Sequence, residues 1–173
     1  MKTNKILSSF LLVVAVILAM PNCLSAQQIK IEVFGAPSFS VSTVSVTDAG
    51  LDISGSIEEA LSNTHLNILA LDRNISNNFE YDVFVSAANL PSNTFLDVKW
   101  ISTGTMPNGS GGGKGALKGG DNYITLSENP HLFFSGKGER VDIDLLFNLR
   151  GLTVAQPMEN LGYNIIFSVV RTK

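Results

Sequence analysis

Paired carboxylates are the first candidates for chemistry in this sequence. Asp142 and Asp144 alternate with apolar residues, and a regular strand would place them on one face about 7 Å apart. Carboxylates about 5–10 Å apart hydrolyse glycosidic bonds, and Asp121 would add a third acid for a calcium site. No aromatic residue is interleaved to hold a sugar, and no dense Asp/Asn/Gly ligand run occurs. We therefore interpret the pair as a solvated strand face that discourages edge-to-edge pairing.

Histidine is the second residue type that could hold a metal. His65 and His131 lie far apart, and neither belongs to a His-x-His or His-Glu-x-x-His spacing. Because Cys23 is the only cysteine, a zinc site would need both histidines together with carboxylates gathered by the fold. Surface or strand-edge histidines are the favoured interpretation, and we expect no metal and no other cofactor.

A glycine-rich segment resembles a phosphate-binding loop only superficially. Such a loop needs glycine at position 108 and Ser or Thr after its lysine, whereas the sequence has Asn108 and Gly115 there. A hydrolase elbow around Ser110 would require the same missing glycine. We predict that 103–120 is a low-complexity loop whose residues 106–115 pack against nothing, and that the protein is not an enzyme.

The elements that position these residues are organised around two long alternating runs. The first is Arg140–Arg150 and the second, interpreted as its partner strand, is Gly162–Lys173. Side chains of a strand point to opposite faces in turn, so each run offers one nearly continuous apolar face. In the first run these residues are Val141, Ile143, Leu145, Phe147 and Leu149. Two strands alone cannot shield such faces from water, so the upstream strands are expected to cover them.

Shorter alternating runs upstream predict the remaining strands. They are Gln28–Val33, Phe39–Val46, Leu51–Ile53, Leu66–Leu71, Phe79–Ala87, Phe95–Ser102, Tyr123–Leu126 and His131–Ser135. Ser56 and Glu59 match a helix capping box, which predicts one turn of helix or an irregular connection. Trp100 is expected to fill the core. The spacing predicts eight to ten strands with little helix, as in an all-β, immunoglobulin-like or pilin-like antiparallel β-sandwich.

The N-terminal 26 residues have the layout of a secretory signal. Lys2 and Lys5 precede an apolar run of about 15 residues, short of the roughly 20 needed for a membrane span. Cleavage after Ala26 would leave residues 27–173 as one domain without cysteine, secreted or at a bacterial cell surface. Losing the two lysines would change the net charge from −3 to −5. The absence of a basic stripe argues against nucleic acid as a partner.

A family resemblance comes from turn and strand patterns spread over most of the mature chain. They are Thr47-Asp48-Ala49-Gly50, Leu51-Asp52, Phe133–Arg140, Val141–Leu149, Arg150–Val154 and Gly162-Tyr163. This order resembles small secreted bacterial β-sandwich proteins that are pilin-like or coat-like, and it implies no catalytic residues. The Gly-Tyr start of the last strand is similar to fimbrial subunits assembled by a chaperone and an usher. Those subunits often contain a disulfide, which the mature chain here would lack.

Three classes of function therefore compete. The favoured one is a non-enzymatic structural or adhesive subunit of a surface assembly, and the alternative is a monomeric module that binds a glycan or a protein. A hydrolase is the third, but the sequence supplies no convergent set of polar residues. Assembly needs a strand that can join another molecule, and Ile29, Ile31 and Val33 form the apolar stripe of the candidate. The expected partners are copies of the chain itself or other surface subunits.

Overall fold

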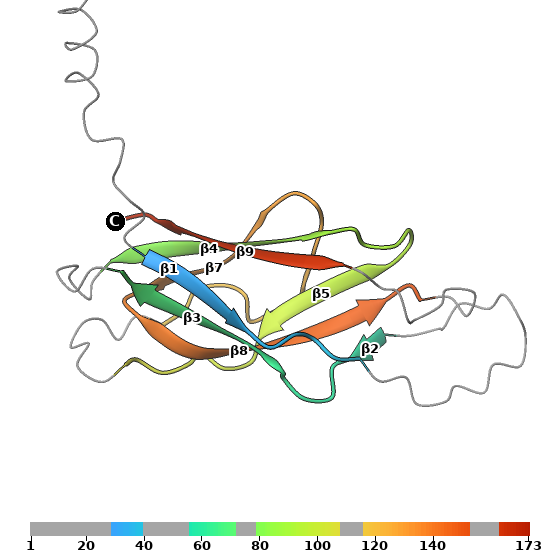
Figure 1. Ribbon diagram of the computed structural model, residues 1–173, viewed down its shortest axis with the longest axis horizontal. Helices are drawn as coiled ribbons and strands as arrows, with labels where there is room; N and C mark the ends of the chain where they lie inside the picture. Colours follow the sequence, from blue (N-terminus) through green and yellow to red (C-terminus); the bar gives the residue numbers. More distant parts are fainter. Residues whose placement is uncertain (1–28, 40–55, 72–78, 108–115, 153–162) are drawn as a thin grey trace, which may run out of the picture.

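The computed structural model describes residues 29–39, 56–71, 79–107, 116–152 and 163–173. These residues form nine strands in two antiparallel sheets and contain no helix (Figure 1). The strands are β1 (Ile29–Phe34), β2 (Ser56–Glu58), β3 (Thr64–Ala70), β4 (Glu80–Ala88), β5 (Phe95–Trp100), β6 (Ile124–Thr125), β7 (His131–Lys137), β8 (Arg140–Arg150) and β9 (Asn164–Arg171). The all-β architecture expected from the alternating runs is therefore confirmed, and it is consistent with a β-sandwich.

The six-stranded sheet, called the large sheet below, is built around β8. Its order is β1-β3-β8-β5-β6, and β2 pairs with the last residues of β8. The three-stranded sheet, called the small sheet, has the order β7-β4-β9. Both sheets contribute to one core cluster, in which Ile143, Leu145, Phe147 and Leu149 of β8 are almost fully buried. Burial of these alternate side chains explains why the longest strand is central, because each stabilises the fold by about 1.5–3 kcal/mol.

The predicted pairing of the two long runs is wrong. β9 pairs with β4 in the small sheet over its whole length, from Asn164 opposite Ala88 to Arg171 opposite Tyr81. β8 lies in the other sheet and pairs with β2, β3 and β5. Alternation gives each run an apolar face but says nothing about its neighbour, which depends on residues distant in the sequence.

Two β-bulges break the alternation that the sequence suggests. Asp142 has a positive φ of 58°, and one extra residue of β8 is accommodated between Ile143 and Arg140 in the pairing with β3. Arg140 is consequently buried, whereas Val141 is only half-buried. In β7 the extra residue is Phe133, so both Phe133 and Phe134 point into the core. A bulge moves every later side chain to the other face, and the periodic pattern does not reveal it.

The helical turn predicted at Ser56–Glu59 is absent. Ser56–Glu58 pairs instead with Asn148–Arg150 as strand β2. Glu59 follows it and is buried, and its Oε1 accepts a hydrogen bond from the Ser38 backbone N–H at 3.1 Å. The Glu59 carboxylate therefore caps backbone groups of neighbouring chain segments rather than the first turn of a helix.

No strand or helix occurs in the described residues of the predicted loop 103–120, but both ends of the loop are anchored. Thr105 forms an antiparallel bridge with Val141, and Lys118 forms another with Ser135. Leu117 lies in the core cluster with only 7% of its surface exposed. Trp100, expected to fill the core, is only half-buried and packs against it, and its indole N–H donates to the Gly119 carbonyl at 2.6 Å. The central residues 108–115 lie outside the described part, as do 1–28, 40–55, 72–78 and 153–162. These ranges include the predicted signal, most of the run Phe39–Val46 and the predicted strand Leu51–Ile53.

Candidate functional site

The candidate assembly strand β1 lies at one edge of the large sheet. It pairs antiparallel with β3 from Ile29 opposite Ala70 to Phe34 opposite His65. Ile29 is buried, Ile31 packs against the core from a half-buried position, and Val33 is 47% exposed. The apolar stripe is therefore buried in the core at its N-terminal end and exposed to solvent at its C-terminal end.

Gly35 ends β1 in a conformation that other residues rarely adopt. Its φ is +76°, and a Cβ added there would collide with the backbone carbonyl of Asn63. A glycine is therefore required by both the backbone angle and the close approach of the chain before β3. This position is the junction at which β1 joins the rest of the fold.

A groove opens between β1 and the edge strand of the small sheet, β9. Its volume is about 340 Å³, and it is lined by Val33, Gly35, Ala36, Pro37, Thr64, Phe147, Tyr163, Asn164, Ile165 and Phe167. Within the described residues β1 pairs only with β3, and β9 only with β4. Both strands lie at the edges of their sheets, and a groove beside a sheet edge is where an extended segment from another molecule can add.

Thr64 gives the groove a polar element. Its side chain is buried, and its hydroxyl finds no hydrogen-bond partner among the residues that the structure describes. An unpaired buried hydroxyl costs about 1–3 kcal/mol.

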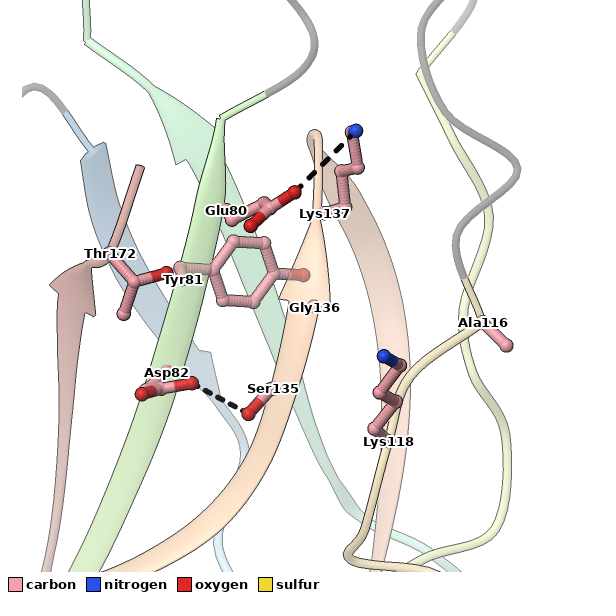
Figure 2. A pocket seen from close by; sticks show the side chains of 9 residues that line it. All are labelled: Glu80, Tyr81, Asp82, Ala116, Lys118, Ser135, Gly136, Lys137 and Thr172. Atoms are coloured by element: carbon pink, nitrogen blue, oxygen red, sulfur yellow. Dashed lines mark hydrogen bonds and ion pairs between the residues drawn. The ribbon is translucent and has the colours of Figure 1, made fainter.

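A second hollow lies on the small sheet, where β4 and β7 run side by side (Figure 2). It has a volume of about 420 Å³, and two of its acidic side chains already have partners. Lys137 lies 3.6 Å from Glu80, and the Ser135 hydroxyl donates to Asp82 at 2.6 Å. Beneath them the Tyr81 ring packs against Gly136, which has no Cβ that would block it. Because burial raises the pKa of Tyr81, its hydroxyl stays protonated and is no base.

The most highly connected polar cluster was not recognised in the sequence. Asp97 on β5 is buried, and Arg150 of β8 binds it with two hydrogen bonds of 2.6 and 2.8 Å. The Thr125 hydroxyl and the Asn148 amide also donate to it, at 2.7 and 3.2 Å. This Asp97 cluster joins three strands on the outer face of the large sheet. The feature of the sequence that could have indicated this cluster is the single acidic residue, Asp97, within a mostly apolar strand.

The two charges of the Asp97 cluster are paired, although the Asn148 Oδ1 is buried without a hydrogen-bond partner among the described residues. Burial on its own raises the pKa of Asp97, but the hydrogen bonds from Arg150 and Thr125 outweigh burial and hold that pKa below its usual range. Tyr123 lies at the side of this face, donates to Glu58 at 2.7 Å and carries Lys99 over its ring at 4.3 Å. The charges of Asp97 and Arg150 are paired, and Lys99 covers the Tyr123 ring. We therefore interpret the cluster as a structural one that stabilises the pairing of these strands.

The residues considered for catalysis or metal binding are not brought together. His65 stacks on Phe34 in the large sheet, whereas His131 opens β7 in the small sheet, 2.8 Å from the Ser127 hydroxyl. Asp142 interrupts the regular strand geometry that would have set its carboxylate beside that of Asp144. No group of three or more His, Cys, Asp or Glu residues suited to a metal ion occurs in the described part of the chain.

Comparison with known proteins identifies no relative. No protein-family model, no curated protein and no solved structure matches this chain. Across the described strands and loops, no helix has the length and apolarity needed to cross a membrane. The functional argument therefore rests on the geometry of the surfaces alone.

Proposed function

We propose that this chain is an exported, non-enzymatic structural or adhesive protein that associates with copies of itself by exchanging β1. In this proposal the sandwich is immunoglobulin-like or pilin-like, the signal in residues 1–26 directs it out of the cytoplasm, and it works at the cell surface. The observation that carries the proposal is the position of β1. Among the described strands it pairs with β3 alone, at the edge of the large sheet, and it directly follows the predicted cleavage site.

Exchange of β1 would recreate in another copy the contacts that the strand makes in its own chain. The six residues of β1 pair with β3, and Ile29 enters the core. Because donor and acceptor are identical, the closed and exchanged forms contain the same β1–β3 contacts, and protein concentration decides between them. The partly exposed Val33 and the adjacent groove offer further apolar contact that only an assembled form would cover.

A disulfide lock tests the proposal. Lys30 lies opposite Leu69 in the β1–β3 register, and neighbouring strands bring such pairs within the range of a disulfide. The chain from Gln27 onward contains no other cysteine. The variant Lys30→Cys/Leu69→Cys is oxidised while dilute, so that β1 is fixed to its own β3.

We expect the unmodified chain to form larger species as its concentration rises, as measured by sedimentation equilibrium. The oxidised variant should remain monomeric, and reduction should restore its association. The same variant kept reduced throughout is the matched control. A wild-type chain that is monomeric at every concentration, or a locked chain that associates like the wild type, would refute strand exchange.

A further inference from the structure

The short segment that follows β1 is fixed at both ends. At its start, the Phe34 ring stacks on the His65 ring of β3, with the ring centroids 5.1 Å apart. At its end, the Ser38 backbone N–H donates to the Glu59 carboxylate at 3.1 Å. Glu59 directly follows β2, so residues 35–37 run from the end of β1 toward β2 (Figure 1). Three residues therefore connect β1 to the first fixed point of the chain that follows it.

Gly35 is the most constrained residue of this segment. Its φ is +76°, and a Cβ added there would collide with the Asn63 backbone carbonyl. Asn63 is itself held, because its side-chain amide donates to the Glu59 carboxylate at 3.4 Å. Glu59 is buried, and it thus fixes both Ser38 and the backbone that Gly35 passes. Ala36, by contrast, is exposed and has no such constraint.

We propose that Gly35–Pro37 is the hinge of β1 exchange and that the left-handed conformation of Gly35 keeps the chain in its closed form. This inference rests on the exchange of β1 proposed above. A hinge is the short segment whose backbone angles differ between two forms of a protein. In the exchanged form β1 lies on β3 of another copy, so the chain between Phe34 and Ser38 takes a different path. Residue 35 is then no longer confined to a positive φ.

A Cβ at position 35 should therefore disfavour the closed form alone. Residues other than glycine are disfavoured about tenfold or more in a left-handed conformation, and the collision with Asn63 adds to this. An exchanged dimer forms from two closed chains, so the factor enters its dissociation constant twice. We expect Gly35→Ala to lower the dissociation constant about hundredfold relative to the wild type, as measured by sedimentation equilibrium.

Gly151 offers a matched control. Its φ is also +76°, and an added Cβ would collide with the Asn93 backbone carbonyl. Gly151 directly follows β8, however, and β8 stays in its own domain when β1 is exchanged. Gly151→Ala should therefore destabilise the closed and exchanged forms equally. It should lower the midpoint of urea unfolding and leave the dissociation constant unchanged.

A longer hinge separates strain at position 35 from a weakened contact of β1. Gly-Ser-Gly inserted after Ala36 lets residue 35 leave the left-handed conformation while β1 stays on its own β3, and such a flexible insertion closes at little cost. Added to Gly35→Ala, the insertion should raise the dissociation constant of the dimer about tenfold or more. Circular dichroism on each variant checks that the fold is retained.

Equal dissociation constants for Gly35→Ala and Gly151→Ala would overturn the hinge assignment, as would a Gly35→Ala dimer that the insertion does not weaken. Exchange itself would survive that result if the oxidised Lys30→Cys/Leu69→Cys pair still keeps the wild type monomeric. A Gly35→Ala dimer that forms despite this oxidised pair would contradict the hinge, because its β1 has not moved. If neither the wild type nor Gly35→Ala associates, both proposals are wrong.

Gly35→Ala that is unfolded while dilute is followed by circular dichroism as its concentration rises. Folding that returns with concentration supports the hinge, because only the exchanged form then escapes the strain at position 35. A chain that stays unfolded at every concentration overturns it.

Discussion

The outer faces of the two sheets differ although both come from alternating strands. On the large sheet the central outward residue is Asp97, a buried acid joined to Arg150, Thr125 and Asn148. On the small sheet the outward residues around Ser168 are apolar and half-exposed. The first face has a buried, hydrogen-bonded carboxylate at its centre, although Phe95 beside it is 47% exposed, whereas the second has half-exposed apolar side chains there. The same alternating pattern therefore gives a polar centre to one outer face and apolar side chains to the other.

The largest expected effect comes from removing the centre of the polar face. Asp97→Ala would leave Arg150, Asn148 and Thr125 without their shared acceptor, and we expect a loss of about 2–3 kcal/mol in the free energy of unfolding. Asp82→Ala is the matched control on the small sheet, where the acid has one hydrogen bond from Ser135, and about 1 kcal/mol or less is expected. Urea unfolding measures both, and equal losses would remove the contrast between the faces.

A smaller effect should appear on acidification. The pKa of Asp97 is lower in the folded chain than in the unfolded chain, so its stabilisation is complete above the unfolded value of about 3.9 and is lost as the pH falls through the folded value. Asp97→Asn should be less stable than the wild type at pH 7 but should lack this loss. The difference between their unfolding free energies should therefore narrow below about pH 4. A difference that stays constant down to pH 2.5 would show that Asp97 is not held by charge.

The sequence was sufficient to locate most strands, because alternation is a local property. The run Phe79–Ala87 became β4, with Tyr81, Val83 and Val85 buried as the period of two requires. It could not assign β9 to β4 rather than to β8, since both choices bury the same apolar face. Partner choice depends on contacts between residues far apart in the chain, and nothing in a periodic run encodes them.

The candidate surfaces were less predictable than the strands. The stripe of Ile29, Ile31 and Val33 could be identified in the sequence. The exposure of Val33, however, depends on where the residues of β9 that line the groove lie in the fold. The bulges at Asp142 and Phe133 change the face of the sheet to which neighbouring side chains point, and the alternation of the sequence does not reveal this change. The Asp97 cluster requires three strands to meet, and Asp97 and Arg150 are 53 positions apart. Such sites arise from register, which follows from the whole fold rather than from one segment.

The smallest expected effect concerns the segment that links the two sheets. Thr105 bridges to Val141 of the large sheet, and Lys118 bridges to Ser135 of the small sheet, so both ends of the segment 105–118 are anchored. Between them, residues 108–115 are mostly glycine, with no large apolar side chain. Replacing 108–115 by a shorter Gly-Ser linker that still spans the gap should change the unfolding free energy by less than about 0.5 kcal/mol, because loop closure depends weakly on length.

Extending the same replacement through Lys118 provides the control. It removes Leu117, whose burial in the core stabilises the fold by about 2–5 kcal/mol, together with the bridge to Ser135. The two deletions differ by three residues, so a large difference in urea midpoint assigns the structural role to Ala116–Lys118 alone. If the shorter replacement is equally destabilising, residues 108–115 make contacts that their composition does not suggest. If both are neutral, Leu117 contributes little and the small sheet is held by β4, β7 and β9 without this link.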